Sequence, residues 1–305
     1  MNHVLTVVLF IVASSALAHD TANVVAGRLD AGNVHERQVH GPDDTGGIDD
    51  WFIGNGTVCA IVSDPAHENE LSPTGGVLTD ISSCDRPGDF FLSSRDFFDG
   101  VSGVVQHETI SAIRIDGSPA LRTTGHSVAG TSETTYRMVP ELPDRILVKK
   151  TFGLTSGPGL PEALALLHLN SDSMRVFIAS THNPEHNSGF AQANFVEVEG
   201  EERKQAIFGG NILVAESLAR RADQVNTIGI LLSKAQISSA HCDSQELPSG
   251  SVSEPNVFGH IVMIDPRCGA EGQVTISIEL EIIVGPAGGA ATVLNDLCEA
   301  CPAIG

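Results

Sequence analysis

From Val274 to Ile282 the chain reads VTISIELEI, an unbroken alternation of apolar and polar side chains. Successive side chains of a strand point to opposite faces of its sheet, so the apolar set faces a core and the polar set faces water. The stretch therefore predicts a strand of a sheet that is covered on one face only.

Shorter runs of the same kind predict further strands along the chain. Asp116-Gly117, directly after one of these runs, is typical of a hairpin turn. Helical periodicity is scarce and predicts only a short helix over 215–222 and a terminal one over 290–300. The predicted strands cover 57–63, 110–115, 145–152, 175–180, 195–199 and 227–232. Many strands with so few helices predict an all-β fold, a large antiparallel β-sandwich, and residues 19–305 are expected to form one domain.

The N-terminus has the pattern of a secretory signal peptide. Residues 4–12 read VLTVVLFIV, and Ala16 and Ala18 provide the small residues that signal peptidase recognises. The apolar run falls short of the roughly 20 residues that span a bilayer. We therefore expect residues 1–18 to be removed, no insertion into a membrane, and a secreted or periplasmic protein that begins at His19.

The charge of the chain narrows the class of partner. Lys and Arg total 17 against 38 Asp and Glu, a formal net charge of −21. Such a surface repels nucleic acid and anionic membranes, but it accepts neutral ligands, cations or basic partners. Nucleic acid is therefore excluded as an expected partner, and a glycan remains a candidate.

Six cysteines in an exported chain predict disulfides. Cys59–Cys84 and Cys242–Cys268 are the natural local pairs. Cys298 and Cys301 form the only CxxC, which lies near the end of the predicted terminal helix. A thioredoxin-type site needs CxxC at the start of a helix, so we interpret these cysteines as a structural disulfide or as partners of a distant cysteine.

Residues 49–62 read DDWFIGNGTVCAIV, in which a Gly-Asn-Gly turn at 54–56 leads into an apolar strand and Trp51 stands just before it. This segment resembles the opening of the β-supersandwich domains of the galactose-mutarotase-like superfamily, which precede the α/α barrel in several glycoside hydrolases and phosphorylases. Residues 75–80, GGVLTD, are similar to a glycine-led second strand in related exported domains. The resemblance spans 49–81 and implies a supersandwich-like fold. The catalytic acid of those glycosidases lies on the barrel, so no residue here matches it.

An acidic, glycine-containing loop is the candidate metal site. Asp43, Asp44 and Asp49 lie close together in the sequence, and carboxylates on a flexible loop suit Ca²⁺. The spacing does not fit an EF-hand, and a solvated acidic turn is the competing interpretation. No other cofactor is expected.

The candidate ligand surface combines Trp51 and Asp50 with the loop of His182 and His186. Sugar rings stack on aromatic side chains, and Trp51 is the only tryptophan. The two histidines flank Pro184, which argues against a helix that would aim both at one metal.

Three weaker patterns point to chemistry. Residues 67–70, HENE, hold acid–base groups. Residues 125–129, GHSVA, approximate the nucleophile elbow of serine hydrolases without its second glycine. An N-terminal His19 could bind copper as in the histidine-brace oxygenases. Each is also explained by a polar turn or by the cleavage position alone.

The favoured functional hypothesis is an exported, non-catalytic carbohydrate-binding module. A secreted hydrolase or lyase acting on glycans is the second hypothesis, with its acid–base groups on the sandwich. A structural or protein-interaction domain is the third. Whether the chain is an enzyme stays open.

Overall fold

The computed structural model describes residues 24–37, 39, 46–68, 74–85, 91–98, 103–155, 160–170, 174–181, 196–198, 201–203, 207–208, 210–217, 225–240, 242–253, 257–269, 272–286 and 288–299. The predicted signal peptide, His19, Asp43, Asp44, His182 and His186 lie outside these residues.

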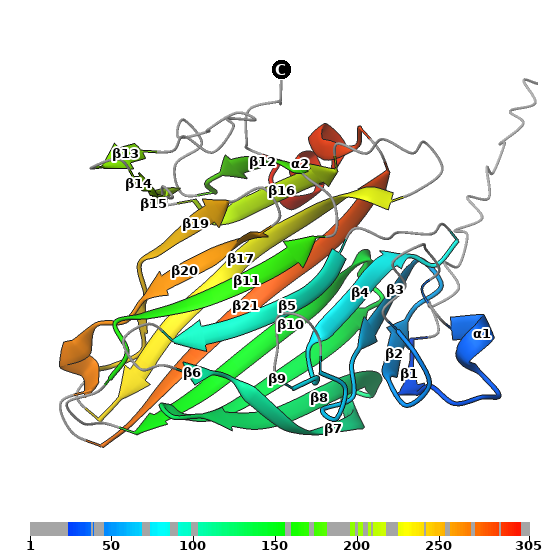
Figure 1. Cartoon of the computed structure of the whole chain (residues 1–305), viewed down its shortest axis with the longest axis horizontal. Helices are drawn as coiled ribbons and strands as arrows, with labels where there is room; N and C mark the ends of the chain where they lie inside the picture. The colour runs from blue at the N-terminus through cyan, green and yellow to red at the C-terminus, as the bar shows by residue number, and fades with distance from the viewer. Residues whose placement is uncertain are drawn as a thin grey trace, which may run out of the picture.

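The described chain is all-β, as predicted, and is built from antiparallel sheets (Figure 1). The largest sheet has nine strands. Its order is β12 (Met174–Ala179), β16 (Ile212–Ser217), β17 (Val225–Ser239), β21 (Gln273–Pro286), β10 (Leu142–Thr155), β9 (Gly130–Val139), β8 (Ser118–Ser127) and β7 (Gln106–Ile115), and β18 (Gln245–Glu246) pairs with β17.

A second sheet has six strands and packs against the nine-stranded sheet. Its order is β15 (Ile207–Phe208), β19 (Ser249–Ser253), β20 (Val257–Met263), β11 (Ala163–Asn170), β5 (Phe91–Phe98) and β6 (Gly103–Val104). Figure 1 shows β5, β11 and β20 lying across the longer strands. One continuous core, which includes Phe98, Phe152, Leu166 and Ile278, joins the two sheets.

The remaining elements cover edges and ends of this sandwich. A four-stranded sheet in the order β1 (Val25–Arg28), β2 (Trp51–Gly54), β3 (Val58–Val62) and β4 (Leu78–Ser83) adds one face to the same core. Its other face forms a small cluster with α1 (Val34–Arg37). The other elements are the β13 (Val196–Val198) and β14 (Glu201–Arg203) hairpin, η1 (Pro266–Gly269) and α2 (Ala290–Leu297).

The alternation that predicted the central strand is confirmed. Ile276, Ile278 and Leu280 of β21 are buried, whereas Ser277 and Glu279 between them are only partly buried on the opposite face. The other six predicted strands all occur, some within longer strands. The predicted terminal helix is α2.

Both turns singled out by the sequence join neighbouring strands. Asp116 and Gly117 connect β7 to β8 with φ of 51° and 84°, the left-handed conformations that a tight hairpin turn needs. Between β2 and β3, the side-chain oxygen of Asn55 accepts the backbone N–H groups of Thr57 and Val58, each at 2.9 Å. The amide of Asn55 donates to the carbonyl of Pro143 at 2.9 Å, which fixes this turn to β10.

The helix predicted over 215–222 is wrong for residues 215–217, which belong to β16, and its remainder lies outside the described residues. The six residues of β16 are all buried. Leu213 and Ala215 face the main core, while Ile212 and Val214 face the cluster around α2. A strand covered on both faces has no polar alternation, so its sequence does not distinguish it from a buried helix.

Two disulfides confirm the local pairs predicted from sequence. Cys59 bonds to Cys84 and Cys242 bonds to Cys268. Cys298 is also disulfide-bonded. Such bonds persist in oxidising compartments, which fits a protein outside the cytoplasm. Within the described residues, no helix is both long and apolar enough to cross a membrane.

Replacing Ile278 by Ala tests the assignment of faces in β21. The Ile278 side chain is fully buried in the core between the sheets, so its truncation is expected to lower the free energy of unfolding by about 2 to 5 kcal/mol. Ser277→Ala on the opposite face is the control and should change it by less than about 0.5 kcal/mol. Urea unfolding measures both, and similar losses for the two variants would contradict the assignment.

Candidate functional site

The outward face of the nine-stranded sheet presents side chains of β17, β21, β10, β9, β8 and β7 to solvent. The residues there are those that alternate with the buried core residues. At one end α2 covers this face, where a Cβ on Gly229 or Gly285 would collide with Val293. We call the uncovered part the polar face.

Strand register arranges the polar face in rows that run across six strands. One row, in which hydroxyl side chains predominate, is Gln236, Ser277, Thr151, Glu133, Thr124 and Thr109. The next row carries charges and reads Lys234, Glu279, Lys149, Thr135, Arg122 and Ser111. Neighbouring strands lie about 4.8 Å apart, so the face repeats hydrogen-bonding groups at that interval.

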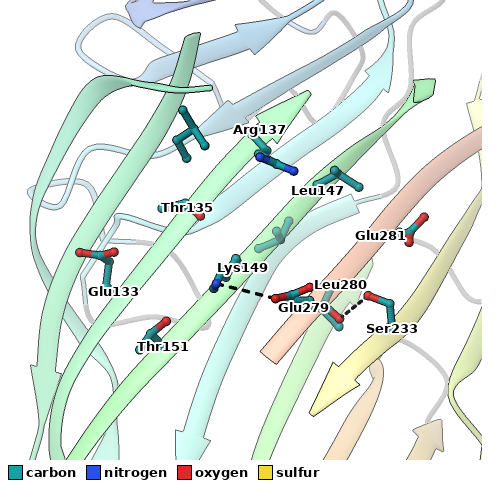
Figure 2. Close-up of a pocket in the computed structure, with 12 residues that line it drawn as sticks. Glu133, Thr135, Arg137, Leu147, Lys149, Thr151, Ser233, Glu279, Leu280 and Glu281 are labelled. Carbon is teal, nitrogen blue, oxygen red and sulfur yellow. Dashed lines mark hydrogen bonds and ion pairs between the residues drawn. The ribbon is translucent and has the colours of Figure 1, made fainter. Parts of the chain in front are cut away.

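Two adjoining hollows lie on this face and share Glu133 and Thr151. The first has a volume of about 410 Å³ and is drawn in Figure 2. The second has a volume of about 520 Å³ and extends toward β7 and β8. Together they form a groove across β9, β10 and β21. The described residues that line it include hydroxyls, amides, carboxylates and ammonium groups, but no aromatic ring.

The charged side chains in and beside the groove form weak ion pairs. One carboxylate oxygen of Glu279 lies 3.7 Å from the ammonium nitrogens of both Lys149 and Lys234. These side chains keep between 39% and 56% of their surface exposed, and such ion pairs contribute little to stability. In Figure 2, Lys149 points toward Glu279, and Ser233 donates to the Glu279 backbone carbonyl at 3.1 Å. These groups can therefore exchange partners with a ligand.

Asp50, which the sequence placed on a ligand surface, is buried in a local hydrogen-bond cluster. One oxygen accepts the backbone N–H of Asp64 at 2.7 Å and contacts His67 Nδ1 at 2.6 Å. The other accepts the backbone N–H of Gly47 at 2.8 Å. With these three contacts the carboxylate joins the turn before β2 to the loop after β3.

Trp51 and Asp49 belong to the same cluster. The half-buried Trp51 indole donates to a carboxylate oxygen of Asp64 at 3.5 Å, and its ring packs against the main core. Asp49 adopts a positive φ of 80° and pairs with Arg28 at 3.2 Å. Neither residue lines the groove.

The remaining predicted site residues are only partly covered by the structure. Asp43, Asp44, His182 and His186 lie outside the described residues, so the predicted calcium loop and histidine loop are not placed. Within the described part of the chain, no group of three or more metal-ligating side chains is gathered. Ser127 ends β8 at a turn into β9, which is not the strand-to-helix geometry of a nucleophile elbow.

Between the two large sheets lies a polar cluster that sequence reasoning missed. The ammonium of Lys150 contacts both carboxylate oxygens of Asp96, at 2.7 and 2.8 Å, and both side chains are at most 5% exposed. The inward-facing residues of β10 are apolar except for Lys150. This exception was the only signal of the cluster in the sequence.

Three buried histidines belong to this region: His107 and His168 lie near the pair, and His260 lies near His168. Burial lowers the pKa of His107 from 6.5 to about 4, with Asp96 opposing and Lys150 adding to the shift. Burial also lowers the pKa of His260 to about 4, which the backbone of Asn211 partly opposes. The pKa of His168 falls well below 6.5 through burial, Lys150 and His260. All three histidines are therefore neutral in the folded protein near pH 7.

Comparison with known proteins gives a distant structural similarity. No family model matches the chain, and no curated protein matches it. Among solved structures it is similar to a chain from Escherichia coli K12 that is provisionally named an aldose 1-epimerase. The TM-score is 0.35 and the identity 10%, over 76% of this chain and 97% of that chain.

The buried histidines predict acid sensitivity. Because their folded-state pKa values lie below 6.5, the unfolded chain binds more protons between pH 6.5 and 4, and stability falls as the pH falls through this window. We expect about 2 to 3 kcal/mol of unfolding free energy to be lost for each of His107 and His260 between pH 7.5 and 4.5. Urea titrations at both pH values measure the loss.

In His260→Leu, the loss of unfolding free energy between pH 7.5 and 4.5 should be smaller, because protonation of His260 no longer opposes folding. His35→Gln is the control, since the exposed His35 side chain on α1 lies away from the buried cluster. If His260→Leu and the unchanged protein lose the same free energy of unfolding, the buried ring of His260 does not titrate in this window.

Proposed function

We propose that this protein is an exported, non-catalytic glycan-binding module that binds its ligand in the groove of the polar face. The observation that carries the proposal is the groove itself, a hollowed and uncovered sheet face on which hydroxyl and charged groups recur in register. Export to the periplasm or the cell exterior is supported by the pattern of residues 1–18 and by the two disulfides.

A polyhydroxylated chain suits such a groove for a geometric reason. Thr135, Thr151 and Ser233 can each donate and accept a hydrogen bond, and Lys149 and Glu133 add charged donors and acceptors. The ligand would be held by hydrogen bonds without ring stacking, because the described lining contains no aromatic side chain. We therefore expect modest affinity and strong dependence on hydroxyl configuration.

The same lack of an aromatic platform favours a second candidate, a protein-interaction surface. A partner protein would use the charged row of Lys149, Glu279 and Lys234 as a polar contact region. Its binding would weaken with salt, since exposed charges are screened at high ionic strength.

Retention on a broad glycan array tests the proposal, with Lys149→Ala as the decisive variant. Loss of one charged hydrogen-bond partner should weaken binding about tenfold or more. Arg114→Ala is the matched control, because it removes one positive charge at the end of β7, outside the groove lining. Equal binding by both variants would contradict a ligand in the groove.

Further arms of the same experiment separate the remaining hypotheses. Loss of binding in Trp51→Ala but not in Lys149→Ala would move the ligand to the surface around Trp51 and Asp50. Loss of glycan binding on chelation would indicate a bound metal, with Asp43, Asp44 and Asp49 as its predicted ligands. Turnover of a bound glycan would favour the hydrolase or lyase hypothesis, and no retention by any glycan would favour a protein partner.

A further inference from the structure

The Lys150–Asp96 contact joins the two large sheets and is unlike the exposed ion pairs of the polar face. Lys150 points inward from β10 and Asp96 from β5, and the two residues lie 54 positions apart in the sequence. Both carboxylate oxygens lie within 2.8 Å of the amine nitrogen. The amine is therefore held directly against the carboxyl group.

The surroundings of this contact combine apolar and uncharged polar side chains. In register, Asp96 lies opposite Leu166, and Lys150 lies between Ile278 and Thr134, all of them buried. Two residues further along the same strands, Phe98 and Phe152 pack edge to face with ring centroids 5.4 Å apart. Burial of a full ion pair costs several kcal/mol per ion, and transfer of one proton from the ammonium to the carboxylate removes both charges.

A third group lies beside the pair. The His107 ring is buried and close enough to both Asp96 and Lys150 for each charge to shift its pKa. The backbone N–H of Val105 donates to the Asp96 carbonyl at 3.1 Å, which brings the start of β7 to β5. Among the described residues, the buried Nδ1 of His107 has no hydrogen-bond partner.

We propose that Lys150 and Asp96 react with each other and form an intramolecular isopeptide bond. The neutral amine nitrogen attacks the carboxyl carbon of protonated Asp96, forming a new C–N bond. The C–O bond to the hydroxyl then breaks, and the hydroxyl leaves as water with a proton from the nitrogen. His107 accepts this proton and passes it to the departing hydroxyl, so the reaction releases one water molecule and requires no other reactant.

Such a bond would connect parts of the fold that the described disulfides leave unconnected. Cys59–Cys84 lies within the four-stranded sheet, and Cys242–Cys268 joins the end of β17 to the turn after β20. The amide would instead join the middle of β10 to β5, and would persist under reducing conditions.

The intact mass of the purified full chain, after reduction and alkylation of its cysteines, tests the proposal. We expect a mass lower by one water molecule than the sequence of the mature chain requires. Trypsin should fail to cleave after Lys150, and one branched peptide should contain both Lys150 and Asp96. The full unreacted mass, with a free Lys150 peptide, would overturn the proposal without any variant.

Variants locate the bond and its proton carrier. Lys149→Met, on the exposed neighbour, should keep the mass loss, whereas Lys150→Met should abolish it. His107→Gln should slow bond formation about a hundredfold after refolding, followed as mass loss over time. Mass loss that survives in Lys150→Met would overturn the assignment, and an unchanged rate in His107→Gln would overturn the role of His107.

Discussion

The side chains that β10 and β21 turn inward pack against β5, β11 and β20, and the rest of the molecule depends on this contact. It buries Ile276, Ile278 and Phe152 in one core with Phe98 and Leu166 of the opposite sheet. Because the strands alternate strictly, burial of one set of side chains forces the other set outward. The polar face is therefore a direct consequence of the core. Its side chains are those of the residues that lie between the buried ones.

Polar groups on the two sides of the nine-stranded sheet have opposite physical roles. On the outside, Glu279 and its two lysines are exposed, weakly paired and able to exchange partners with a ligand. On the inside, Lys150 and Asp96 are desolvated, in close contact and unable to exchange with solvent. Adjacent residues Lys149 and Lys150 thus differ in environment only because successive positions of β10 face different sides.

Asp50, Trp51 and His67 lie in one hydrogen-bonded cluster with Asp64. The Asp50 carboxylate accepts two backbone N–H groups and contacts one imidazole, so it stabilises the entry to β2. The segment that carried the resemblance to supersandwich domains is therefore placed by its own hydrogen bonds at the four-stranded sheet. The groove lies elsewhere, across β9, β10 and β21.

The sequence by itself determined the all-β class, most strand positions, the terminal helix, the turn at Asp116-Gly117 and two disulfide pairs. These features depend on local alternation, on residues that tolerate positive φ, or on cysteines close in the chain. It failed at β16, because a strand covered on both faces has no polar period. Only the tertiary structure decided that Lys149 and Glu279 meet in one groove, with Lys234 beside them, and that Lys150 meets Asp96. Those contacts join strands far apart in the sequence. The register of these strands depends on how whole sheets pack, and no local sequence pattern predicts it.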